Sequence, residues 1–261
     1  MKKNFSVKTI ASAIFAATVL FTACNEKSPE ALYDSGLRYV KGDGVEKNVE
    51  KGVSLLKKSA NKGYLPAFRQ VGSALMNNGS IQEGLSWCEL AIEKGDAKTA
   101  RDIAHTYYTG NSKYDIQKDY KKAVSLFHTA IALDEANSGD CYACLGDCYY
   151  QGLGVETNYD KAFEYYHKAS SFDETPSSAY ATLGILYYNG YGVQKNKKKA
   201  VECFTRGAEW GDSNCLWNLA VCYDSGDGVA KNRKIALEYV KKAAKLGHKE
   251  ALDFISTWNG R

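Results

Sequence analysis

A glycine-rich motif recurs in phase along this chain of 261 residues, and it constrains the fold more than any other feature. Each of four copies reads as a small residue, a tyrosine three positions later and then Gly-x-Gly-Val, at residues 35–45, 145–155, 183–193 and 219–229. The valines that end the last three copies are 38 and 36 residues apart. Periods of this length are typical of repeat proteins, in which each unit buries its apolar face against the next unit.

Each copy predicts a helix, a glycine loop and a second helix. After the loops, apolar residues recur every three or four positions at residues 161–169, 199–208 and 235–244, which is the helical period. The paired glycines end the first helix because glycine adopts positive φ readily. Two degenerate copies, at residues 71–78 and 103–110, fill the gap between the first and fourth motifs. Just before the second helices stand asparagines suited to cap their free amide groups, namely Asn48, Asn158, Asn196 and Asn232.

A small residue stands at the same place in every first helix, where glycine costs about 1 kcal/mol relative to alanine. Its recurrence predicts that a neighbouring backbone lies there, too close to allow a side chain. The six residues are Gly36, Gly72, Ala104, Gly146, Gly184 and Ala220.

The core A-x-x-x-L-G-x-x-Y-x-x-G-x-G-V of these copies resembles the Sel-one-like repeat, a relative of the tetratricopeptide repeat, over about residues 31–248. The resemblance implies an all-α fold, a right-handed α/α solenoid of about six helix-turn-helix repeats that occupies residues 31–261. Residues 249–258 would form a final helix that caps the array. It also implies a scaffold that binds a protein or peptide, with no enzymatic activity.

The first residues predict export. A basic head with three lysines precedes an apolar or small-residue stretch from Ile10 to Phe21, as in a secretory signal peptide covering residues 1–23. Twelve helical residues span only about 18 Å, too little to cross a bilayer. The sequence Phe-Thr-Ala-Cys that ends at Cys24 is similar to the lipobox of bacterial lipoproteins, which implies a lipidated Cys24 and a tether over residues 24–30. Asn25 after this cysteine favours the outer membrane or cell surface over the inner membrane.

Charge argues against a nucleic-acid partner. The formal net charge is +4, but three of the 34 basic residues and none of the 30 acidic ones lie in the leader. The remaining chain is near neutral and shows no basic stripe of the kind that binds nucleic acid. We therefore expect a protein or peptide partner and attachment to the membrane through the lipid alone.

The cysteines and histidines predict neither a metal site nor a cofactor. Cys141, Cys144 and Cys148 share one helix face, but Cys141 occupies the alanine position of other repeats and free cysteine behaves as a small buried apolar residue. Cysteine-rich members of the similar family bridge adjoining repeats, at positions that carry no cysteine here. Pairing such as Cys203 with Cys222 stays open. The histidines His105, His128, His167 and His248 show no ligand spacing.

The alternative function is an envelope hydrolase that acts on β-lactam or peptidoglycan, because cysteine-rich members of that family have been linked to penicillin. Ser54 with Lys57, and Ser59 with Lys62, match the S-x-x-K motif, but the partner motifs S-D-N and K-T-G are missing. We expect no catalytic residues.

The tyrosines form two sets. Tyrosines at the third position after the small residue are expected to pack between helices. By analogy with tetratricopeptide arrays, tyrosines at the fourth position after it would line the concave groove. Tyr, Trp and Arg are frequent anchors of protein interfaces; the alternative is that these side chains are merely solvated or packed. The predicted groove comprises Arg101, His105, Tyr108, Asp147, Tyr150, Tyr188, Trp217 and Asp224.

Overall fold

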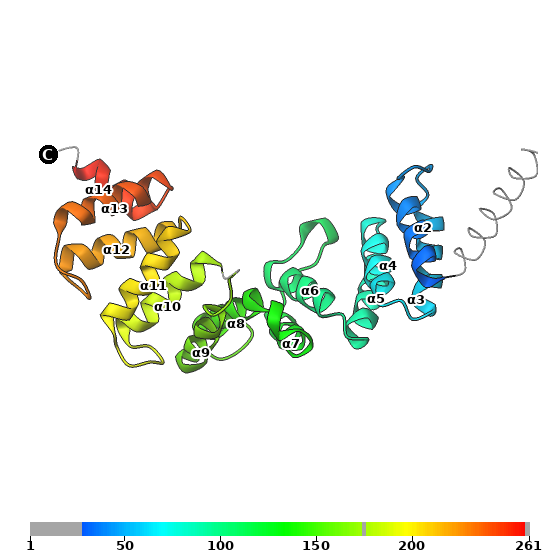
Figure 1. Ribbon diagram of the computed structural model, residues 1–261, viewed down its shortest axis with the longest axis horizontal. Coiled ribbons are helices and arrows are strands. Elements are labelled where there is room, and N and C mark those ends of the chain that lie inside the picture. The colour runs from blue at the N-terminus through cyan, green and yellow to red at the C-terminus, as the bar shows by residue number, and fades with distance from the viewer. Residues whose placement is uncertain (1–27, 174–175, 259–261) are drawn as a thin grey trace, which may run out of the picture. The chain divides into compact units, whose positions relative to one another are not determined.

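The computed structural model describes residues 28–173 and 176–258 (Figure 1). Within these residues the chain forms thirteen α-helices and two short 3-10 helices, and no strand. The predicted all-α fold of paired helices is confirmed. The proposed lipidation site Cys24 and its leader lie outside the described residues.

First and second helices alternate along the chain, and in the first, second, fourth, fifth and sixth repeats the first helix makes its most extensive contacts with the second helix of its own repeat. The first, or A, helices are α2 (Pro29–Lys41), α4 (Leu65–Asn77), α6 (Ala97–Thr109), α8 (Gly139–Gln151), α10 (Ser177–Asn189) and α12 (Ser213–Ser225). The second, or B, helices are α3 (Val49–Asn61), α5 (Ile81–Glu93), α7 (Tyr120–Leu133), α9 (Tyr159–Ala169), α11 (Lys197–Glu209) and α13 (Arg233–Lys245). The 3-10 helices are η1 (Ser112–Tyr114) and η2 (Glu135–Asn137).

The chain divides into two compact units whose boundary falls inside α6. The first unit runs to Ala100 and includes Ser112–Asp115; the second contains Arg101–Asn111 and continues from Ile116. All eight residues of the predicted groove belong to the second unit.

The predicted asparagine caps are confirmed. The side chain of Asn158 accepts a hydrogen bond from the Lys161 amide at 2.9 Å, and Asn48, Asn196 and Asn232 cap their helices in the same way. In addition, the backbone N–H of Asn158 donates to the Tyr149 carbonyl of the A helix at 2.9 Å. One residue therefore starts helix B and ties it to helix A.

The small residue of helix A faces its own B helix, but the neighbour differs from the predicted backbone in the later repeats. A β-carbon on Gly184 would lie 2.3 Å from the Phe204 ring, and one on Gly146 would lie 2.9 Å from the Tyr166 ring. Among the four glycines at this position, backbone approaches closely at Gly36 and Gly72; a β-carbon on Gly72 would lie 2.8 Å from the Gly84 carbonyl oxygen. The prediction of a close backbone is thus wrong for Gly146 and Gly184, where a bulky aromatic ring occupies the space.

The second glycine of the loop contacts the preceding repeat. A β-carbon on Gly192 or Gly228 would lie 2.1 or 2.3 Å from the carbonyl oxygen of Tyr159 or Lys197, the first residue of the preceding B helix. Both glycines also have positive φ, +66° and +75°. Each loop is therefore fixed against the repeat before it.

Apolar side chains between the helix pairs form the core. In the second unit Leu186, Leu219 and Phe204 are at most 2 % exposed. Full burial of such a side chain stabilises the fold by about 1.5–3 kcal/mol. The predicted last helix is α14 (Lys249–Trp258), which packs on α13. None of the described helices is both long and apolar enough to cross a membrane.

Candidate partner-binding surface

Helix α6 presents Arg101, His105 and Tyr108 on one face, because residues spaced by three or four positions lie side by side on a helix. This face meets α8, the A helix of the next repeat. The Arg101 guanidinium donates to the Asn137 carbonyl and lies 3.9 Å from Asp140 Oδ1. Arg101 thus contacts the next repeat directly.

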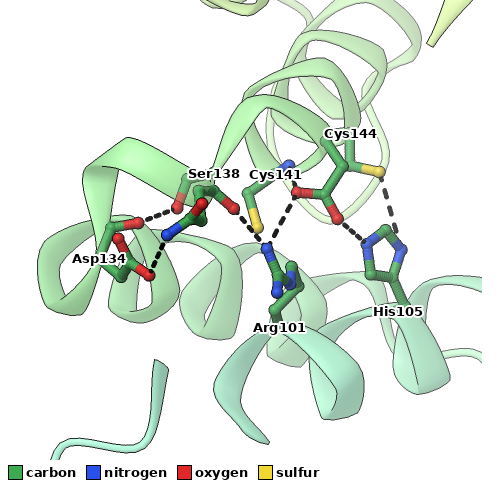
Figure 2. Close-up of polar contacts among 8 residues, drawn as sticks. Arg101, His105, Asp134, Ser138, Cys141 and Cys144 are labelled. Atoms are coloured by element: carbon green, nitrogen blue, oxygen red, sulfur yellow. Dashed lines mark hydrogen bonds and ion pairs between the residues drawn. The ribbon is translucent and has the colours of Figure 1, made fainter. Parts of the chain in front are cut away.

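His105 lies between a carboxylate and a thiol of α8. Its Nε2 is 3.0 Å from Asp140 Oδ2, and its Nδ1 is 4.0 Å from Cys144 Sγ. Figure 2 shows the His105 ring pointing at Cys144, with Arg101 one helical turn away. Burial opposes ionisation of Asp140, but the hydrogen bond from His105 and the charges of His105 and Arg101 hold the pKa of this carboxyl below its usual range. Burial, followed by the charges of Asp147 and Asp140, raises the pKa of the Cys144 thiol.

Asp147 is the centre of a second contact between these repeats. Its Oδ1 accepts a hydrogen bond from the Tyr166 hydroxyl at 2.5 Å, and its carboxylate is also hydrogen-bonded to Tyr108. Burial raises the pKa of Asp147, although the two hydroxyls oppose this shift. The same burial and the Asp147 charge raise the pKa of Tyr108. Tyr108 and Asp147, both half-buried, therefore hold one another across the contact between the two repeats.

Tyr150 belongs to a cluster of three tyrosines. Its ring contacts Tyr159 edge-on, with centroids 5.6 Å apart, and Tyr159 stacks on Tyr191 at 4.9 Å. Tyr191 stands between the two glycines of the next loop, so the cluster spans two repeats. Tyr159 and Tyr191 are 40 % and 42 % exposed. We call Tyr150, Tyr159 and Tyr191 the tyrosine cluster.

Tyr188 occupies the equivalent position one repeat later, in a polar setting. Its hydroxyl donates to Asp227, whose other oxygen lies 2.6 Å from Lys197 Nζ. The hydrogen bond to Asp227 is the main reason that the pKa of Tyr188 rises to about 12. Lys197 and Asp227 replace the Tyr159 and Tyr191 of the preceding contact.

The structure places the last two predicted residues apart from these contacts. The Trp217 ring stacks on the His248 ring at 5.3 Å and packs on the core of the last repeats. Asp224 is exposed and lies 3.3 Å from Arg233 Nε.

Sequence reasoning missed Asp140, Tyr159, Tyr191, Lys197 and Asp227. For the last four, the signal was available by aligning the repeats at two further positions: the residue between the glycines and the first residue of helix B. At these positions the pair changes from two tyrosines to an aspartate and a lysine in successive repeats.

The S-x-x-K motifs gain no support from the structure. Lys57 Nζ forms an ion pair with Glu83 at 2.7 Å and lies over the Trp87 ring. These contacts favour the charged ammonium, which cannot act as a base for Ser54. Ser59 is buried and donates its hydroxyl hydrogen bond to the Pro29 carbonyl.

The chain matches the family model described as Sel1 repeat in six segments, 29–64, 78–96, 98–135, 140–171, 177–212 and 213–248. The degenerate copy at residues 103–110 lies in the third segment, whereas the copy at residues 71–78 meets the short second segment only at its last residue. The six predicted repeats are thereby confirmed.

Solved structures with the same fold include a protective antigen of uropathogenic Escherichia coli, c5321, with a TM-score of 0.69 and 23 % identity. The match covers 95 % of this chain and 50 % of the antigen. A Sel1 repeat protein from Oxalobacter formigenes matches with a TM-score of 0.55 and 28 % identity over 88 % of this chain and 76 % of that protein.

Among curated sequences, the uncharacterized protein NMB1327 of Neisseria meningitidis is 27 % identical over 142 residues, 54 % of this chain. The chain spans 29 % of the length of the Neisseria protein and half of the Escherichia antigen.

Proposed function

The chain belongs to the Sel1 repeat family, and we propose that it is a non-enzymatic scaffold of the bacterial cell envelope that binds a protein or peptide through the A-helix surface of its second unit. Sel1 and tetratricopeptide-like repeats generally bind such partners. The tyrosine cluster supports the choice of surface, and the sequence of residues 1–24 supports the choice of compartment.

The tyrosine cluster is the main observation in favour of this surface. It combines a predicted groove residue, Tyr150, with two tyrosines that expose about two fifths of their area while stacked on one another. Tyrosine anchors interfaces well because it offers a large apolar face and a polar tip with few rotatable bonds. Since the stack already orders both rings, a partner would gain contact area at a small further loss of side-chain entropy.

The remaining predicted residues support this surface in another way. Arg101, His105, Tyr108 and Asp147 are engaged with α8 and α9, so they hold successive A helices together. The partner's contacts would then centre on Tyr150, Tyr159 and Tyr191, with Trp217 further along the chain.

Site-specific photo-crosslinking in the bacterial envelope tests the proposal. A photoreactive phenylalanine derivative replaces Tyr191 in one variant and Trp210 in another, each in the full chain. Trp210 is the matched control, since it is an aromatic side chain, 71 % exposed, at the end of a B helix. We expect one discrete protein adduct from position 191, abolished by Tyr159→Ala, and none from position 210.

An adduct that forms from position 210 alone, or that survives Tyr159→Ala undiminished, would place the partner on another face. The absence of adducts from both positions would count against a scaffold that uses this unit.

A further inference from the structure

The Cys144 thiol and the His105 imidazole face one another from adjacent A helices, and we propose that they bind one monovalent soft metal ion, Cu(I), between Sγ and Nδ1. The site differs from the cysteine-rich face considered from the sequence. Cys141 and Cys148 on that face are buried, whereas Cys144 is half-buried and meets a histidine of the preceding repeat.

The spacing of the two donors suits one ion held between them. Cys144 Sγ and His105 Nδ1 are 4.0 Å apart. Bonds from a transition-metal ion to cysteine sulfur and histidine nitrogen are each about 2 Å long, so an ion on the line between the donors needs about 4 Å. Two-coordinate binding of this kind is available to Cu(I), for which thiolate and imidazole are suitable ligands.

Asp140 prepares the histidine for this role. Asp140 Oδ2 lies 3.0 Å from His105 Nε2, and a carboxylate at this place favours the tautomer in which the Nε2–H group donates the hydrogen bond. The lone pair of a neutral imidazole is then on Nδ1, directed at Cys144. A carboxylate behind the ligating histidine is the usual arrangement at metal sites, where it fixes the ring and its tautomer.

The number of ligands and the local charge favour a monovalent ion. Over the residues that the structure describes, no three His, Cys, Asp or Glu side chains are grouped to hold a metal. A structural zinc ion, which takes four ligands, is therefore poorly served. Binding follows Cys–SH + Cu⁺ → Cys–S–Cu + H⁺, so one cation replaces another and the site charge is unchanged. Charged groups already surround the site: the Arg101 guanidinium lies 3.9 Å from Asp140, and the Asp147 carboxyl is close to the thiol. An ion that leaves the net charge of the site unchanged does not disturb these neighbours.

The histidine of the site is partly accessible to solvent. The side chains of His105 and Asp140 are 36 % and 34 % exposed, so an ion in solution can approach the imidazole.

Anaerobic titration of the reduced full chain with Cu(I), in competition with a chromophoric Cu(I) chelator, measures the affinity. We expect one tight equivalent per chain. Cys144→Ser and His105→Gln should each weaken it at least 100-fold, and Asp140→Ala about 10–100-fold, as at other metal sites that lose the carboxylate behind a histidine. The matched control is Cys203→Ser, which removes the other half-buried thiol of this unit, one with Glu202, Arg206 and Lys199 as its charged neighbours. This variant should bind within twofold of the parent.

X-ray absorption on the copper-loaded parent chain gives a readout that no substitution can confound. One sulfur and one nitrogen in the first shell support the site. Two sulfurs, or unchanged affinity in Cys144→Ser, would overturn it, as would an equal loss in Cys144→Ser and Cys203→Ser.

Discussion

A β-carbon on Gly192 would lie 2.1 Å from the carbonyl oxygen of Tyr159, the residue that begins the B helix of the preceding repeat. The contact joins two repeats through backbone atoms, so no side-chain movement can relieve it. Gly192 also has a φ of +66°, in the region that side chains other than glycine avoid.

Gly192→Ala should therefore destabilise the chain strongly. Backbone strain and the clash together predict a loss of about 2–5 kcal/mol in the free energy of unfolding. Gly211→Ala is the matched control, because Gly211 has a φ of +78° but no atom within 4 Å of its β-carbon position. This variant should lose only about 1–2 kcal/mol. Urea unfolding followed by circular dichroism measures both, and equal losses would show that the contact with Tyr159 is unimportant.

Gly184→Ala tests the contact between a small residue of helix A and an aromatic ring of helix B. Alanine gains about 1 kcal/mol of helix propensity, but its β-carbon would lie 2.3 Å from the Phe204 ring. We expect a net loss of about 1–3 kcal/mol from overpacking. In a Phe204→Leu background the same substitution should cost at least about 1 kcal/mol less, which a double-mutant cycle measures. An identical cost in both backgrounds would exclude the ring as the cause.

Asp227→Asn should lower the pKa of Tyr188 from about 12 towards the ordinary tyrosine value, because the hydrogen bond to this carboxylate is the main cause of the rise. In the folded chain the raised pKa favours the protonated hydroxyl. Its contribution to stability is thus complete below the unfolded pKa of about 10 and is lost as pH rises through about 12. Carbon-13 NMR of labelled tyrosine, assigned with Tyr188→Phe, follows the titration. Asp224→Asn, which loses only the Arg233 contact, should leave it unchanged; a shift in both variants would contradict the local cause.

Cys24→Ser should abolish lipid attachment if the leader is processed as its sequence predicts. Growth with an alkyne-labelled fatty acid, followed by capture of the chain, measures incorporation. Cys203→Ser should retain the label. Because a single short apolar segment cannot hold the chain in a bilayer for long, Cys24→Ser should also release the protein from washed membranes. Label that persists in Cys24→Ser would refute lipidation at this residue.

Local features could be predicted from the sequence because they depend on a few neighbouring residues. Asn158 caps its helix, and the paired glycines end theirs, whatever lies beyond. Contacts between repeats could not be derived in the same way. His105 meets Cys144 across 39 residues, and Tyr159 meets Tyr191 only because the glycine loop lies on the preceding B helix. The period of the motif gives the order of the repeats but not the rotation of one against the next.

The predicted groove illustrates this difference. Tyr108 and Asp147 contact one another, and Arg101 and His105 contact Asp140 of the next A helix. These four residues of the predicted groove are thus partly engaged within the molecule. Trp217 contacts His248, and Asp224 contacts Arg233. Comparing equivalent positions of the repeats would not have indicated either contact. Whether Tyr150 and its neighbours bind a partner stays a prediction.

The loop at Gly192 packs on the start of α9. We therefore expect the segment that unfolds cooperatively to have different bounds from the repeat seen in the sequence. Such a unit would contain helix B of one repeat together with helix A and the glycine loop of the following repeat. Amide protons at the start of α9 should then exchange with solvent at rates close to those of the 190–192 loop, although about 30 residues separate them. Exchange of a repeat that begins with helix A would separate Tyr159 from Gly192. A graft whose ends lie just before successive B helices would carry both residues together.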